Sequence, residues 1–146
     1  NSGMQSEYNN ITYSYSYLMC LSLETGEAKR IVDKPIISFC LTDDAVYYTP
    51  FELRHMYIPE DYKEHPENVV VFLASPELHS CDLDGGNDKI LYTNKNMDFA
   101  KLYTVIDGVL YGWLWDYDES LHRFGSTYFG IINLSTGKVT ATVKPK

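Results

Sequence analysis

Three segments of the chain repeat one pattern: a strand of alternating apolar residues, a polar turn containing glycine, and a second strand. They are CLSLETGEAKRI (20–31), CDLDGGNDKIL (81–91) and IINLSTGKVTATV (131–143). The three segments align on a shared glycine, and tight hairpins need glycine because the turn places a residue at positive φ. Each segment is therefore predicted to be a β-hairpin.

A second pattern alternates with the first. The segment SFCLTDDAVYYT (38–49) matches LYTVIDGVLYGW (102–113), with Asp44 aligned on Asp107. Asp-Gly between two apolar runs is a strong hairpin signal. Two successive hairpins make a four-stranded antiparallel unit, so the sequence predicts an all-β fold built from repeated four-stranded units.

The whole chain, residues 1–146, is expected to form one domain of such units. A half unit spans 11–32, a second unit spans 36–92, and a third unit spans 99–144. This spacing is typical of propeller blades or a related array.

The second unit carries an insertion at 51–68, FELRHMYIPEDYKEHPEN, which is polar and contains two prolines. It is predicted to be a loop with room for one helical turn, followed by a strand in the apolar run VVVFLA (69–74). Long insertions often carry function. This one also holds side chains of metal-ligating types without any metal-site spacing: His55, Glu60, Asp61, Glu64 and His65.

The segments IDGVLY (106–111) and YFGIINLSTGKV (128–139), like DDAVYY (43–48) and LHSCDLDGGNDKIL (78–91), resemble the blade repeats of bacterial β-propellers. They are similar to those of Tol-associated and YWTD-type propellers, and to uncharacterised repeats in surface proteins of Gram-positive bacteria. The resemblance implies a binding or scaffolding role in a bacterial envelope or surface protein, with an extracellular or envelope location. The resemblance assigns no functional residue to this chain.

The same resemblance implies a partial propeller of about two and a half blades, whereas a closed propeller typically has four or more. A partial stack leaves an apolar face and bare strand edges exposed. We therefore expect the chain to form a homo-oligomer, to be part of a longer chain, or to curl into an open β-sandwich. Pairing is expected through the first hairpin, residues 17–32, or through the last unit.

The formal net charge of −8 argues against nucleic acid or an anionic membrane as a partner. No apolar stretch approaches the roughly 20 residues needed to span a bilayer, so no membrane insertion is expected. The three cysteines, Cys20, Cys40 and Cys81, provide no disulfide framework and are expected to be reduced, buried strand residues.

The segment DLDGGND (82–88) offers several oxygen donors but does not match an EF-hand loop. Counted from Asp82, position six is Asn87 and position twelve is Thr93, where the loop requires Gly and Glu. Its acidic residues are predicted to stabilise the turn by bonding nearby backbone. No metal and no cofactor is expected.

The segment VLYGWLWDYDE (109–119) places four rings at a spacing of two residues, so all four are predicted on one face of a strand. Rings near the strand end are expected to be exposed and Trp113 to be core. The speculative ligand-binding residues are these rings and the carboxylates beside them: Tyr111, Trp113, Trp115, Tyr117, Asp116 and Asp118.

No nucleophile elbow and no phosphate-binding loop occurs in the sequence. The favoured function is therefore a non-enzymatic module that binds protein or glycan. The alternative is a fragment of a glycan-acting hydrolase that uses Asp116, Asp118 or Glu119 as its carboxylates, with the two aspartates about 7 Å apart on one strand face.

Overall fold

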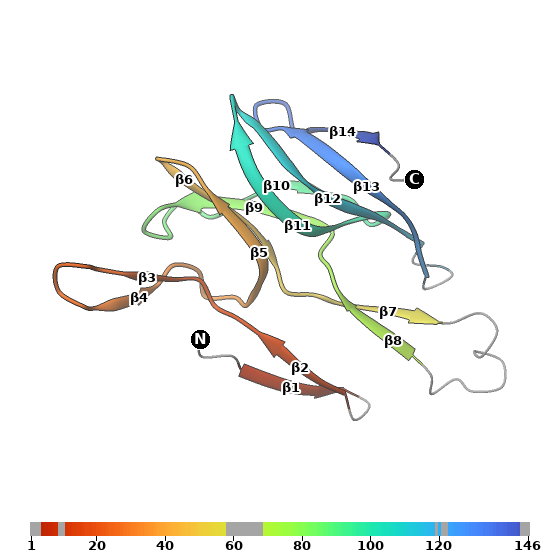
Figure 1. The fold of residues 1–146 in the computed structure, drawn as a ribbon, viewed down its shortest axis with the longest axis horizontal. Coiled ribbons are helices and arrows are strands. Elements are labelled where there is room, and N and C mark those ends of the chain that lie inside the picture. The colour runs from red at the N-terminus through yellow and green to blue at the C-terminus, as the bar shows by residue number, and fades with distance from the viewer. Residues whose placement is uncertain (1–3, 9–10, 58–68, 119, 121–122, 144–146) are drawn as a thin grey trace.

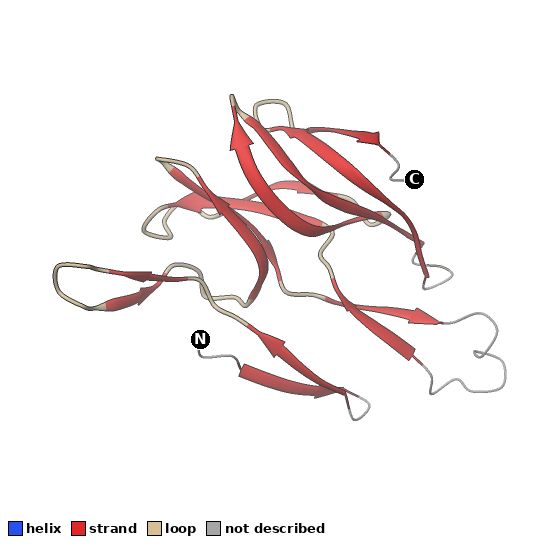
Figure 2. Cartoon of the chain, viewed as in Figure 1, coloured by secondary structure: helices blue, strands red, loops and turns tan. Residues whose placement is uncertain are grey.

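The computed structural model describes residues 4–8, 11–57, 69–118, 120 and 123–143, and these residues form fourteen strands and no helix (Figures 1 and 2). Every strand pairing among them is antiparallel. The prediction of an all-β, antiparallel fold is confirmed. The described part of the chain also contains no helix long and apolar enough to cross a membrane.

The first four-stranded sheet, here called the middle sheet, has the order β10-β9-β6-β5. Its strands are β5 (Ile36–Leu41), β6 (Ala45–Pro50), β9 (Glu77–Asp82) and β10 (Lys89–Thr93). The hairpins predicted at both ends of this unit are present, because β5 pairs with β6 and β9 pairs with β10.

The second four-stranded sheet, here called the C-terminal sheet, is a meander of order β11-β12-β13-β14. Its strands are β11 (Met97–Ile106), β12 (Val109–Asp118), β13 (Arg123–Asn133) and β14 (Lys138–Val143). Asp107 and Gly108 connect β11 to β12 with φ values of 51° and 73°. Two successive positive φ angles define the type I′ turn, as the Asp-Gly signal predicts.

Between β6 and β9 the chain makes an additional hairpin from β7 (Leu53–Tyr57) and β8 (Val69–Leu73). The strand predicted at Val69 is confirmed, but the prediction of a loop from residue 51 is wrong for 53–57. This segment has no spacing of two, and it is a strand because the apolar β8 pairs with it along its whole length. Residues 58–68, including the four ligand-type side chains from Glu60 to His65, lie outside the described residues.

The N-terminal part contains two more hairpins. One pairs β1 (Met4–Tyr8) with β2 (Ile11–Tyr15), and the other pairs β3 (Met19–Leu21) with β4 (Ala28–Arg30). The second is the predicted hairpin, and its turn glycine, Gly26, has a φ of 74°. The first was not predicted from the polar start of the chain.

The middle sheet packs against other parts of the chain on both faces. Leu78 of β9 lies in an apolar cluster shared with the C-terminal sheet, whose other buried members are Cys40, Phe99, Leu102, Leu110, Leu114 and Ile132. Three residues farther along the same strand, Cys81 belongs to a second cluster with Ile31, Val32, Ile36, Val46 and Tyr48. The N-terminal segment around Ile31 therefore covers one face and the C-terminal sheet covers the other, giving three stacked layers (Figure 1).

Polar contacts also connect the layers. The backbone N–H of Leu102 in β11 donates to Ser38 Oγ in β5 at 2.9 Å. Ser75, just before β9, exchanges two backbone hydrogen bonds with Phe99 of β11. These contacts fix the position of β11 against the middle sheet and thereby place its partner β12, whose end carries the candidate site.

Candidate functional site

Strand β12 separates its side chains cleanly between two faces. Leu110 and Leu114 are fully buried in the apolar cluster against the middle sheet. Gly112 lies between them and pairs with Gly130 of β13. A Cβ at Gly130 would overlap the side chain of Leu114. The sheet can therefore pack closely on this side, and the large side chains of β12 lie on the other.

The opposite face of the C-terminal sheet is aromatic and half-buried. The Trp113 ring meets Phe129 edge-on with centroids 5.8 Å apart, and Tyr111 and Tyr103 lie 6.1 and 6.3 Å from the same ring. Trp115 lies on this side by alternation along β12, where it pairs with Thr127. We call the set Tyr103, Tyr111, Trp113, Trp115 and Phe129 the aromatic face.

Two expectations about the ring stripe are wrong. The pairing of β12 with β13 shifts register between Trp115 and Tyr117, and this bulge interrupts the alternation on which the prediction rested. Tyr117 is consequently buried, at 4% exposure, instead of exposed at the strand end. Trp113, expected in the core, is half-buried on the aromatic face.

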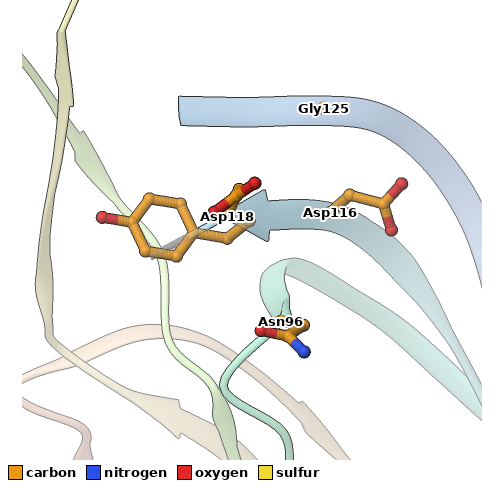
Figure 3. A pocket seen from close by; sticks show the side chains of 5 residues that line it. Asn96, Asp116, Asp118 and Gly125 are labelled. Carbon is orange, nitrogen blue, oxygen red and sulfur yellow. The ribbon is translucent and has the colours of Figure 1, made fainter. Parts of the chain in front are cut away.

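A pocket of about 470 Å³ lies at the end of β12 and is open to solvent (Figure 3). Its lining residues come from three successive segments of the C-terminal sheet: Asn96, Asp116, Tyr117, Asp118 and Gly125. Asp116 and Asp118, predicted to share a strand face, thus line one pocket. The tryptophans predicted to join them do not line it.

Asp116 is held by a neighbouring strand. The Tyr128 hydroxyl donates to Asp116 Oδ2 at 2.6 Å, and this hydrogen bond raises the pKa of Tyr128. Since Tyr128 also packs against the apolar cluster, the carboxylate lies on the core side of the sheet. A Cβ at Gly125 would lie 3.0 Å from the Asp116 Cβ, so glycine leaves the space that the carboxylate borders.

Asp118 is held by the turn that follows it. Its Oδ1 accepts from the backbone N–H of Ser120 at 3.0 Å and from the Ser120 hydroxyl at 2.6 Å. Across the pocket, the backbone oxygen of Asn96 accepts from the Tyr117 N–H at 3.1 Å. The pocket walls are therefore connected by backbone as well as by side chains.

Both carboxylates act as hydrogen-bond acceptors in these contacts, as ionised carboxylates do. A carboxylate can accept more than one hydrogen bond, and the Asn96 amide can both donate and accept. The pocket therefore presents side chains of the types that bind hydroxyl groups. Glu119, the third carboxylate considered from sequence, lies outside the described residues.

A partly buried polar network in the middle sheet was not predicted from sequence. His79 is 3% exposed, and its Nε2 lies 2.9 Å from Glu77 Oε2 while its Nδ1 lies 3.3 Å from Asp88 Oδ1. A neutral imidazole has one N–H and can donate to one carboxylate, whereas the protonated ring donates to both. In the sequence, the only indication of this network is that Glu77 and His79 are two residues apart and therefore share one face of a strand.

Asp88 is the centre of this network. Its Oδ1 accepts from the Tyr48 hydroxyl at 2.7 Å, and its Oδ2 lies 3.6 Å from Lys34 Nζ. Burial alone would raise the Asp88 pKa, but hydrogen bonds from Tyr48 and His79, with the Lys34 charge, lower it overall. The pKa of Tyr48 is raised by burial and by the same hydrogen bond.

The acidic turn after β9 is stabilised by its own side chains. The N–H of Gly86 donates to Asp84 Oδ1 at 2.9 Å, and Asn87 Nδ2 donates to Asp82 Oδ2 at 2.6 Å. This confirms the interpretation of the acids as turn residues. Within the described ranges, no three His, Cys, Asp or Glu side chains are placed to hold a metal ion.

No protein-family model matches the chain, and no curated protein is significantly similar to it.

Proposed function

We propose that the chain is a non-enzymatic binding module and that the pocket at the end of β12 binds a hydroxyl-rich ligand of the glycan class. The observation that carries the proposal is the convergence of Asp116, Asp118 and Asn96 on one solvent-open pocket. Carboxylate and amide oxygens accept hydroxyl hydrogen bonds, and hydroxyl groups are the polar groups that a sugar presents.

The hydrogen bonds inside the pocket support a binding role. Asp116 accepts from the Tyr128 hydroxyl, and Asp118 accepts from the Ser120 hydroxyl. Such contacts preorganise acceptors for a ligand and reduce the ordering cost of binding.

The stacked sheets support the scaffold part of the proposal. Each four-stranded sheet is a meander with its hairpins at the positions of the blade-like repeats, and the middle sheet interposes one extra hairpin. We infer that these sheets are propeller-type blades and that the module belongs to an envelope or surface protein of a bacterium.

A glycan array probed with the 146-residue chain tests the pocket. Glycans bound by the wild-type chain should lose at least about tenfold in affinity with Asp116→Asn or Asp118→Asn, since about 1.4 kcal/mol of lost hydrogen bonding corresponds to that factor. The matched control is Asp43→Asn, which removes an exposed carboxylate from the β5–β6 turn and should bind as the wild type does.

Two outcomes would reject the proposal. One is an array without any bound glycan. The other is turnover of chromogenic glycosides that disappears when Asp116, Asp118 or Glu119 is replaced, which would identify a hydrolase.

A further inference from the structure

The β3–β4 hairpin has the same backbone geometry as the β13–β14 hairpin of the C-terminal sheet. In both turns the glycine has positive φ, 74° at Gly26 and 66° at Gly137. The glycine N–H donates in each case to the backbone oxygen four residues earlier, to Ser22 at 2.9 Å and to Asn133 at 2.8 Å. The cross-strand pairs before the turn also correspond, namely Leu21 with Ala28 and Ile132 with Val139. Strand β3 is therefore the structural counterpart of β13.

The two hairpins differ in what lies beside them. Strand β13 pairs with β14 on one edge and with β12 on the other, and β9 of the middle sheet likewise has a strand on each side. Among the strands that the structure describes, β3 pairs with β4 alone (Figure 1). Ile132 of β13 thus faces Leu110 of β12, whereas its counterpart Leu21 faces no described strand on that edge.

The hydrogen bonds of the hairpin show which backbone groups lie along this edge of β3. The N–H of Ser22 and the backbone oxygen of Leu18 bond across the hairpin, each at 2.9 Å. In an antiparallel pair, residues that bond to the partner strand alternate with residues that do not. The N–H and C=O groups of Met19 and Leu21 therefore point away from β4, toward the free edge.

This edge is accessible from solvent. Met19 and Leu21 are 46% and 57% exposed, and Cys20 between them is also exposed. A row of outward N–H and C=O groups on an exposed strand is a template for the addition of another strand. In the two four-stranded sheets of this chain, the corresponding edges of β9 and β13 are occupied by β6 and β12.

We propose that the free edge of β3 binds a β-hairpin of a partner polypeptide by strand addition, in the register that β12 has on β13. In this mode of recognition, main-chain hydrogen bonds supply affinity and alternate side chains supply specificity. The added hairpin completes a four-stranded sheet with β3 and β4, of the same kind as the other two in the molecule.

The strands that already occupy the corresponding position define the chemistry of the partner. Each places an aliphatic residue and then a tyrosine against the positions that correspond to Leu21 and Cys20: Val46 and Tyr47 in β6, and Leu110 and Tyr111 in β12. The partner strand is therefore an extended segment with an aliphatic residue opposite Leu21 and a tyrosine opposite Cys20. Each strand is also joined to a preceding antiparallel strand, β5 or β11, so the binding unit is a hairpin.

The test uses a peptide that models this partner. The probe is a synthetic, fluorescently labelled peptide with the sequence of residues 36–50, the β5–β6 hairpin, with serine in place of Cys40. A disulfide between cysteines added at its two ends closes the hairpin and lowers the ordering cost of binding. Fluorescence anisotropy with the 146-residue chain should show saturable binding.

Two proline variants of the chain identify the edge. Leu21→Pro removes an N–H that points to the free edge, and binding of the peptide should weaken at least about tenfold. The matched control is Ala28→Pro, because Ala28 pairs directly with Leu21 and its N–H points to the opposite edge of the same hairpin. It should bind the peptide as the wild type does. Circular dichroism and melting temperature establish that both variants are folded.

Two modified peptides test the same contact without any change to the chain. The Thr42 N–H donates to the Ala45 oxygen at 2.9 Å, so the backbone groups of Leu41 and Val46 point outward on opposite edges of the probe. N-methylation at Val46, on the edge that pairs with β3, should abolish binding. N-methylation at Leu41, on the other edge, should leave it unchanged.

Three results would overturn the proposal. One is a wild-type chain that does not bind the unmodified peptide. Another is equal binding within the proline pair or within the N-methyl pair, because binding would then not involve the edge of β3. The third is self-association of the wild-type chain that Leu21→Pro abolishes, which would identify a second copy, and not a partner hairpin, as the occupant of this edge.

Discussion

Asp88 joins three segments of the chain through its two carboxylate oxygens. Oδ1 meets Tyr48 of β6 and His79 of β9, and Oδ2 faces Lys34 of the N-terminal segment. Burial opposes ionisation of this carboxylate, but the hydrogen-bond donors and the Lys34 cation around it favour the ionised form. Its pKa is therefore lowered. One side chain thus couples the N-terminal layer to the middle sheet, and its effect depends on pH.

Asp88→Asn keeps an oxygen acceptor for Tyr48 but removes the charge. We expect the free energy of unfolding at pH 7 to fall by about 1 kcal/mol, a modest value because the carboxylate is partly exposed. Because the Asp88 pKa is lower in the folded state, its charge stabilises the fold at pH values above the unfolded-state pKa of about 3.9. This contribution is lost as the pH falls through the folded-state pKa. Urea unfolding of both proteins between pH 3 and 7 should show the difference narrowing at the acidic end.

The control for this measurement is Asp107→Asn, which removes an exposed charge at a turn position that asparagine tolerates. Its unfolding free energy should stay within about 0.5 kcal/mol of the wild type. A stability difference for Asp88→Asn that is constant with pH would contradict the assigned role of the charge.

Among the elements, the β9–β10 turn shows how closely two hairpins can meet. Gly85 has a φ of 91°, and a Cβ there would overlap the backbone oxygen of Ile31. Lys29 Nζ of β4 donates to the Asp84 backbone oxygen at 3.0 Å. The turn therefore packs directly on the N-terminal hairpin, and glycine is required for the approach as well as for the backbone angle.

Gly85→Ala and Gly26→Ala separate these two requirements. Both glycines have positive φ, but nothing lies within 4 Å of a Cβ at Gly26. Gly26→Ala should cost about 1–2 kcal/mol for the backbone angle, and Gly85→Ala about 1–3 kcal/mol more for the overlap. Thermal or urea unfolding measures both, and equal losses would mean that the turn does not pack on Ile31.

At the scale of the whole molecule, the two apolar clusters lie on opposite faces of the middle sheet and each contains one cysteine. Cys40 belongs to the cluster with the C-terminal sheet and Cys81 to the cluster with the N-terminal segment. Burial raises the pKa of Cys40 to about 11 and also raises that of Cys81. Cys20, expected to be buried, is exposed on the short strand β3, where a two-stranded hairpin gives little cover.

Thiol labelling of the native protein should consequently modify Cys20 within minutes and leave the other two cysteines unmodified, because the thiolate is the reactive form and burial disfavours it. If the three layers unfold as one unit, Cys40 and Cys81 should become labelled at equal rates as urea is added. Mass spectrometry of the labelled peptides gives the rates. Earlier labelling of Cys81 would show that the N-terminal layer opens separately.

The sequence by itself determined the hairpins and the fold class. The Asp107-Gly108 turn and the Gly26 turn are encoded locally, since few residue types adopt positive φ, and alternation on either side supplies the strands. The close placement of Asp116 and Asp118 was predictable for the same reason, because both lie on one strand. These features depend on neighbours within a few positions of the chain.

Only the tertiary structure decided the features that depend on distant partners. The bulge after Trp115 arises in the pairing with β13, and it buries Tyr117 and divides the predicted ring cluster between a pocket and the half-buried aromatic face. Strand β7 forms because β8 pairs with it, and the environment of His79 is assembled from several segments. Sequence alternation cannot specify register between strands, so it cannot tell which side chains meet across a sheet.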